Sequence, residues 1–184
     1  ALNVQGDDIP HILEDETGLQ LIAPPGDWQQ RTDMKFTKRL RASVVARARF
    51  VEDLIIEQSK KRVGQYVILG AGLDTFAQRR PDIASKLQVY EIDQPDTQTW
   101  KQQRLLELGF GVPEWLHFVP VNFETSSWRE QLLKAGFDIN KPAVVACTGV
   151  SLYLTKAAIA STLNQIATLA PGSKLAMTFY LPME

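Results

Sequence analysis

Short, mainly apolar runs alternate along the chain with longer stretches in which apolar residues recur every three or four positions. The runs at 67–69, 89–93, 117–121, 143–146 and 174–181 have the length and the β-branched content of strands, although a run this short could also be buried helix. Parallel strands are often continuously apolar because helices cover both of their faces. Strands alternating with helices form a parallel sheet with right-handed crossovers, so the pattern predicts one α/β domain.

The longest helical pattern runs from Lys35 to Lys61, and the basic residues around it are most simply interpreted as a solvated face. The apolar residues of this helix would form one buried face: Leu40, Val44, Ala48, Val51 and Ile55. Three further helices begin with recognisable signals. Pro95 suits a first turn, Ser127 opens a capping box with a glutamate three residues later, and Thr155 is a good N-cap.

The candidate chemistry lies between the first two predicted strands. Gly70, Ala71 and Gly72 follow the first strand, and their minimal side chains let the backbone turn sharply and let a ligand approach it. A helix is expected next, with its free N–H groups facing the turn. Asp93 ends the second strand about 20 residues further on, where a carboxylate in this architecture binds ribose hydroxyls. These features predict a nucleoside-binding βαβ unit, with an accidental aspartate as the alternative.

The turn departs from the NAD fingerprint G-x-G-x-x-G. The third glycine is replaced by Thr75, and Asp74 puts a negative charge at the expected helix start. That charge would repel a diphosphate, which argues against a nicotinamide-dependent oxidoreductase. A ligand with a ribose and a positively charged centre, such as S-adenosylmethionine, fits better.

Four strings, in this order, carry a family resemblance: LGAGLDT, VYEIDQP, CTGVSLYL and LAPGSKLAMTF. They resemble the leucine carboxyl methyltransferase-like family of class I S-adenosylmethionine-dependent methyltransferases, and the resemblance covers the chain from about Arg39 onward. It implies a doubly wound, Rossmann-like, mostly parallel sheet and S-adenosyl-L-methionine as the cofactor. It also implies transfer of a methyl group to a carboxylate or hydroxyl oxygen of a small molecule or protein.

The resemblance further assigns ligand contacts. In the family, an arginine in A-R-x-R-F-x-D pairs with the carboxylate of the cofactor's amino-acid tail, and Arg47 matches it, with Arg49 as the runner-up. Two positions depart from the family pattern. Asn122 stands where an aspartate usually binds the adenine amino group, and Thr148 stands where many relatives have a glutamate near the cofactor's methyl and amino end. The other expected contacts are Gly70, Ala71 and Gly72 for the tail and sugar, Asp93 for the ribose, and Phe123 for the adenine.

The resemblance also implies that the chain consists of an N-terminal segment and a cofactor-binding domain. Residues 1–34, which proline and glycine interrupt repeatedly, would belong to a cap over the active site, although a flexible leader is an equal alternative. A short helix between Ile12 and Ile22 is a weak possibility. Residues 35–184 would be the cofactor-binding domain. Class I methyltransferases normally continue beyond the fifth strand with a helix and an antiparallel strand pair, so we expect this chain to be C-terminally incomplete.

The composition of the chain limits the kinds of partner that it is expected to bind. The chain has 184 residues and a formal net charge of −1, so no basic excess favours nucleic acid. No stretch approaches a membrane span, and the first residues are acidic and polar rather than basic and then apolar as in a signal peptide. The single cysteine is compatible with a reducing cytosol, so we expect a cytoplasmic protein without a membrane partner. The two histidines and Cys147 lack metal-like spacing, so no metal is expected.

Cys147 is expected to be a small buried hydrophobe rather than a nucleophile, because no histidine lies near it in the sequence. The sequence identifies no catalytic residue. It leaves open the methyl acceptor, the oligomeric state and a second interpretation, a non-catalytic nucleoside-binding or regulatory module.

Overall fold

The computed structural model describes residues 12–179, and five strands of this part of the chain form one parallel sheet in the order β3-β2-β1-β4-β5. Their bounds are β1 Gln65–Leu69, β2 Gln88–Asp93, β3 Leu116–Pro120, β4 Ala143–Cys147 and β5 Lys174–Met177. All five predicted strands are present. The fifth ends at Met177, earlier than predicted, and residues 180 and 181 of the predicted strand lie outside the described residues. The strand order reverses direction beside β1, which places the topological switch point between β1 and β4.

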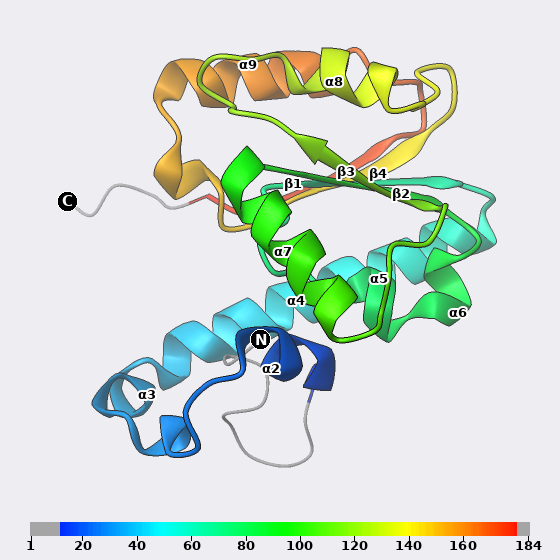
Figure 1. Ribbon diagram of the computed structural model, residues 1–184. Helices are drawn as coiled ribbons and strands as arrows, with labels where there is room; N and C mark the ends of the chain where they lie inside the picture. Colours follow the sequence, from blue (N-terminus) through cyan, green and yellow to red (C-terminus); the bar gives the residue numbers. More distant parts are fainter. Residues whose placement is uncertain (1–11, 180–184) are drawn as a thin grey trace.

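Helices cover both faces of the sheet, as a doubly wound fold requires (Figure 1). One face carries α8 (Trp128–Lys134) and α9 (Lys156–Ile166). The other carries α4 (Lys38–Lys60), α5 (Phe76–Arg79), α6 (Pro81–Ala84) and α7 (Pro95–Glu107). The predicted N-caps are confirmed, because the hydroxyl of Ser127 accepts a hydrogen bond from the Glu130 amide and that of Thr155 accepts one from the Ala158 amide.

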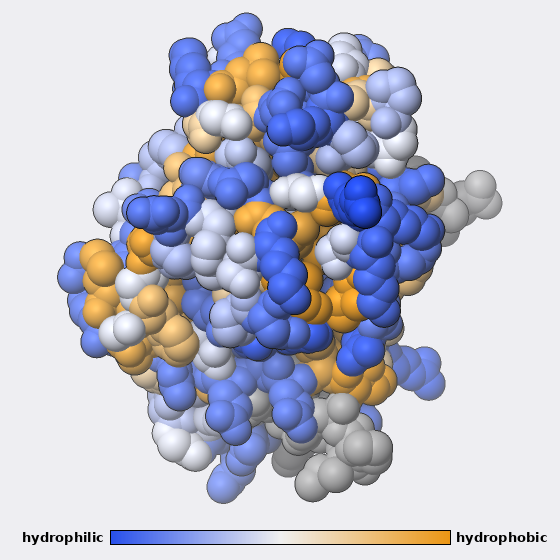
Figure 2. All heavy atoms as spheres, turned by 90° about the vertical axis from the view of Figure 1, so that its right-hand side faces the viewer, coloured by the Kyte–Doolittle hydropathy of each residue, from blue (hydrophilic) through white to orange (hydrophobic). Residues whose placement is uncertain are grey.

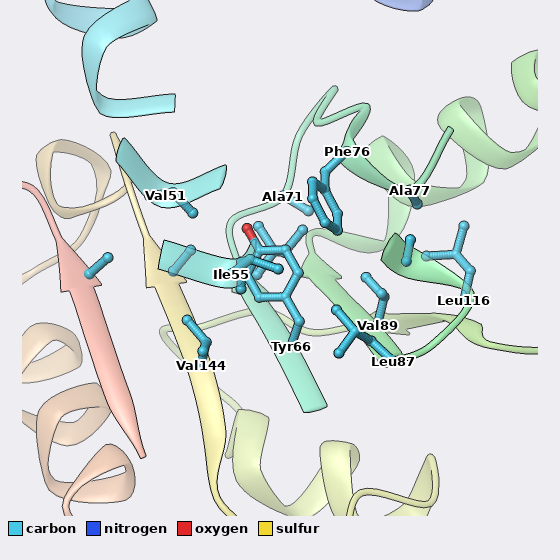
Figure 3. Packing of buried hydrophobic residues seen from close by; sticks show 14 of the residues in the cluster. Val51, Ile55, Tyr66, Ala71, Phe76, Ala77, Leu87, Val89, Leu116 and Val144 are labelled. Atoms are coloured by element: carbon cyan, nitrogen blue, oxygen red, sulfur yellow. The ribbon is translucent and has the colours of Figure 1, made fainter. Parts of the chain in front are cut away.

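Alternation along the strands builds two apolar layers. Tyr66 of β1 points toward α4 and α5, where it meets Val51, Ile55 and Phe76 (Figure 3). The rings of Tyr66 and Phe76 are 5.4 Å apart and nearly perpendicular. Val67, the next residue, belongs to the opposite cluster under α8. Burial of each large side chain stabilises the fold by about 1.5–3 kcal/mol, so these layers fix the strands that carry the site.

The face of the molecule shown in Figure 2 is covered mainly by hydrophilic residues.

The buried face of α4 differs from the predicted one. Leu40 is 52% exposed and Val44 only half-buried. Val51 and Ile55 of the predicted face are buried, and the other buried positions are Arg41, Val45, Glu52 and Gln58. The reason is that charged side chains found partners: Arg41 donates to the Met34 carbonyl and to the Thr37 hydroxyl. An apolar periodicity cannot indicate which charged groups will be satisfied in the interior.

Residues 12–34 form more regular structure than proline and glycine suggested. The weakly predicted helix exists as α2 (Glu16–Ile22), followed by a 3-10 turn at Trp28–Gln30 and by α3 (Thr32–Phe36). The Asp15 carboxylate caps α2 by accepting from the Gly18 amide and also accepts from the Thr75 hydroxyl at 2.6 Å. This buried contact attaches α2 to the segment after the glycine turn.

The single helix predicted after the glycine turn is wrong. Two one-turn helices, α5 and α6, stand in its place, and the first begins only at Phe76. The Asp74 carboxylate accepts from the Phe76 amide at 2.9 Å, so Asp74 does lie at a helix start. Pro81 ends α5 and opens α6, since proline disfavours helical geometry in the residue before it but suits a first helical turn.

We predict that Cys147 is inert while the chain is folded. The side chain is 1% exposed and burial raises the pKa of its thiol to about 11, so almost no thiolate exists at neutral pH. A disulfide exchange reagent should label the chain slowly when folded and fully in denaturant. Because the folded pKa lies above the unfolded value of about 9, the thiol's contribution to stability should decline between pH 9 and 11. Rapid labelling of the folded chain at neutral pH would contradict this burial.

Candidate functional site

A pocket of about 360 Å³ opens beyond the carboxyl ends of the central strands. It lies at the switch point, where open α/β sheets bind ligands, and its volume is within the usual range for small-molecule sites. Four of the predicted contacts line it: Gly70, Gly72, Asp93 and Phe123. Seven further residues line it as well: Gln94, Thr97, Glu124, Gly149, Val150, Tyr153 and Leu154.

The glycine turn is tied to the end of β2 by backbone hydrogen bonds. The amides of Gly70 and Ala71 both donate to the Ile92 carbonyl, at 2.8 and 3.0 Å. The Gly72 amide donates to one carboxylate oxygen of Asp93 at 2.6 Å, and the Gln94 amide donates to the other, also at 2.6 Å. Each carboxylate oxygen has a second lone pair. The half-buried Asp93 carboxylate is therefore fixed at the pocket wall and can still accept bonds from ligand hydroxyls.

Arg47 of α4 does not line the pocket itself, but its guanidinium lies against Gly149 of the pocket wall. A Cβ atom added to Gly149, which lines the pocket, would lie 2.8 Å from Nη2 of Arg47. The half-buried guanidinium of Arg47 makes no hydrogen bond or ion pair with any residue between 12 and 179. Arg49, the runner-up, lies on the exposed side of α4 and forms a bidentate pair with Asp53. Arg47 is thus the arginine beside the glycine turns, with its donors available to an anionic group.

Thr148 and Asn122 lie outside the walls of this pocket. Thr148 lines a separate cavity of about 60 Å³ on the α4 side of the sheet, together with Asp74 and Arg79. The side-chain oxygen of Asn122 accepts from the Glu124 amide at 3.0 Å, so it shapes the turn after β3. The structure therefore groups Gly70, Gly72, Asp93 and Phe123 around one space. Arg47 lies behind Gly149 of its wall, and Thr148 and Asn122 lie outside the lining.

Glu124 and Gly149 are two of the pocket residues that sequence reasoning missed. The Glu124 carboxylate accepts from both the amide and the hydroxyl of Thr155, at 2.9 Å each, and so links the turn after β3 to the start of α9. Gly149 stands at φ +76°, which lets the chain pass under Arg47. The string CTGVSLYL contains this glycine, but the sequence does not show that it lies against Arg47 of α4. That contact explains why a residue without a side chain stands here.

The electrostatics of the pocket are mixed. Two carboxylates, Asp93 and Glu124, line it, and the Arg47 guanidinium lies at its side. Such an arrangement opposes a diphosphate but suits a ligand that combines hydroxyls, one carboxylate and a cationic centre. Within residues 12–179 no cluster of three or more histidine, cysteine, aspartate or glutamate residues could hold a metal ion. In that same range no helix has the length and apolarity needed to cross a membrane.

The sheet order, the glycine turn and the acid at the end of β2 define a Rossmann-like domain of the class I methyltransferase type. The family model described as leucine carboxyl methyltransferase matches residues 1–167, and the chain belongs to this family.

The names of similar proteins refer to S-adenosyl-L-methionine. The chain is 37% identical over 142 residues to "Putative S-adenosyl-L-methionine-dependent methyltransferase YktD" of Bacillus subtilis (strain 168), covering 77% of this chain and 46% of that protein. A relative from Mycobacterium avium (strain 104) with the same description is 34% identical, over 84% of this chain and 51% of its own length. The chain thus spans about half the length of these relatives. The apo crystal structure of the S-adenosylmethionine-dependent methyltransferase SibL is also similar, with a TM-score of 0.48 and 16% identity over 84% of this chain and 40% of SibL.

We predict that the two glycines of the turn respond differently to alanine. Both have positive φ, which costs a non-glycine residue about 1–2 kcal/mol. At Gly70 the new Cβ would also lie 2.2 Å from Cγ2 of Val150, whereas at Gly72 it meets nothing within 4 Å. Gly70→Ala should therefore lower the free energy of unfolding by about 3 kcal/mol and Gly72→Ala by about 1 kcal/mol. Urea denaturation measures both, and equal losses would contradict the close approach of Val150.

Proposed function

We propose that the chain is the cofactor-binding part of an S-adenosylmethionine-dependent methyltransferase that methylates a carboxylate or hydroxyl oxygen. The observation that carries the proposal is the pairing of two features at one pocket: the Asp93 carboxylate bound to the glycine turn, and the unpaired Arg47 guanidinium beside Gly149. Family membership and the names of the relatives support the same cofactor.

In this proposal, residues in and around the pocket would each contact one part of the ligand. Asp93 would accept hydrogen bonds from the ribose hydroxyls, and Phe123 would pack against the adenine. Arg47 would pair with the carboxylate of the amino-acid tail, and the backbone of Gly70–Gly72 would contact the tail and sugar. Asn122 keeps one lone pair on its amide oxygen for the adenine amino group. Thr148 would lie near the tail, on the side of the smaller cavity.

Bound S-adenosylmethionine would supply an electrophilic methyl group for an acceptor oxygen. The residues of this chain would hold the ligand in one orientation and keep water from the reacting atoms, and such alignment can supply much of the rate. A carboxylate acceptor needs no general base, whereas a hydroxyl acceptor would be helped by one. We assign no base: no histidine among residues 12–179 lines the pocket, and the Glu124 carboxylate in its wall is bonded to Thr155.

We also propose that residues 1–34 form a cap on the domain of residues 35–184. Two contacts of the described part of this segment support the division. Asp15 accepts from the Thr75 hydroxyl next to the glycine turn, and Arg104 of α7 donates to the Leu21 carbonyl at 3.2 Å. The cap would thereby be attached to the two elements that follow the first two strands.

We predict that substitutions of Arg47 and Arg49 have different effects on ligand affinity. Calorimetric titration with S-adenosylhomocysteine should show Arg47→Met weakening the affinity at least about tenfold, because a charge-assisted contact with the tail carboxylate is lost. Arg49→Met is the matched control: it removes an exposed pair with Asp53 and should leave the affinity unchanged. NAD should not bind. Equal affinities for the two variants would remove Arg47 from the site.

We predict further that the transferred methyl group ends on oxygen. Incubation with methyl-labelled cofactor and candidate acids and alcohols should give a labelled product. Alkali releases methanol from a methyl ester but leaves a methyl ether intact, so the two acceptor classes are distinguished directly. Label retained on nitrogen or carbon would contradict O-methylation. Tight binding without turnover for any acceptor would instead favour the non-catalytic nucleoside-binding module.

A further inference from the structure

A buried ion pair lies beneath the glycine turn and takes no part in the pocket lining. Lys101 of α7 and Glu91 of β2 contact each other, and both side chains are 1% exposed. Lys101 also donates to the backbone carbonyl of Asp74 at 2.5 Å. Gln98, one turn earlier on α7, donates to the Glu91 carbonyl at 2.5 Å. One ammonium group thus joins a helix, a strand and the loop that follows the turn.

Stability alone does not account for this pair. Removing two charges from water costs more than a single contact between them usually returns, and apolar residues of similar volume often serve a fold equally well. One oxygen of Glu91 is buried without a hydrogen-bond partner. Burial raises the pKa of Glu91 to about 7 even though Lys101 opposes the shift. The contact that an apolar pair could not supply is the hydrogen bond from Lys101 to Asp74.

That hydrogen bond acts on the segment that shapes the pocket. Asp74 follows Gly72 by two residues, and the Gly72 amide is bound to Asp93. Asp93 in turn lies two residues beyond Glu91 on the same strand, hence on the same face. The start of the loop is therefore attached to β2 through the Gly70 and Ala71 amides and through Asp93, and its later part, at Asp74, is attached through Lys101 and Glu91.

We propose that Lys101 and Glu91 are positioning residues, which hold residues 70–75 in the conformation that binds the cofactor. The inference rests on the proposed function for its ligand, but the conformation itself is set by contacts within this chain. Neither residue touches the pocket. They act through the Asp74 carbonyl and, by way of β2, through Asp93.

The double variant Glu91→Leu/Lys101→Met tests this. It replaces both charges with apolar side chains of similar volume, so the fold should retain a cooperative urea transition. The loop loses its attachment at Asp74, and we expect the dissociation constant for S-adenosylhomocysteine to rise at least about tenfold. Lys101→Met alone should be the least stable variant, because it leaves the Glu91 carboxylate buried without its partner. A purely structural pair would instead leave the affinity of the well-folded double variant at the wild-type value.

Gln65→Leu is the matched control. Gln65 is also buried, but it bonds to Asp138 and Lys141 at the opposite end of β1, so its loss should lower stability without changing the affinity. Amide hydrogen exchange of residues 70–76 gives a readout that needs no ligand. If wild-type protein fails to bind S-adenosylhomocysteine, the proposed function fails, yet faster exchange confined to this loop in the double variant would still support the positioning role. Unchanged exchange in the double variant would overturn the role.

Discussion

The hydrogen bond from the Gly72 amide to the Asp93 carboxylate is the interaction on which the candidate site depends. Asp93 ends a strand that is paired on both sides, with β1 and with β3, so the sheet sets the position of its carboxylate. The turn is then brought to that carboxylate by its own amides. The position of the glycine turn is thereby fixed relative to a central strand. A site that acts by aligning its reactants requires such fixed positions.

Buried charges hold the segment after the turn. Glu52 of α4 pairs with both Arg79 and Arg80, the Thr75 hydroxyl donates to Asp15, and Lys101 joins Glu91 to the Asp74 carbonyl. These contacts come from the cap segment, α4, β2 and α7, and they converge on the stretch from Asp74 to Arg80. Directional hydrogen bonds specify one backbone conformation where short helices bury too little apolar surface to do so.

The charges around the pocket account for the ligand that we propose. Asp93 and Glu124 oppose a diphosphate, while Arg47 offers a single site for a carboxylate. A nucleoside with a cationic centre and an amino-acid tail satisfies all three groups at once. Membership of the leucine carboxyl methyltransferase family supports the same ligand.

The sequence by itself determined the five strands, the N-caps and the place of the glycine turn and Asp93 in the chain, because periodicity, turn residues and strand ends are local signals. It misjudged the face of α4 and the helix after the turn. Only the tertiary structure decided that Arg41, Glu52 and Lys101 would be buried, because a charge enters the interior only where partners distant in sequence satisfy it. Likewise Gly149 came to lie under Arg47 through the packing of α4 on the sheet, and Asn122 was found to shape a turn. Such contacts between residues distant in the sequence depend on the whole fold and leave no local pattern in the sequence.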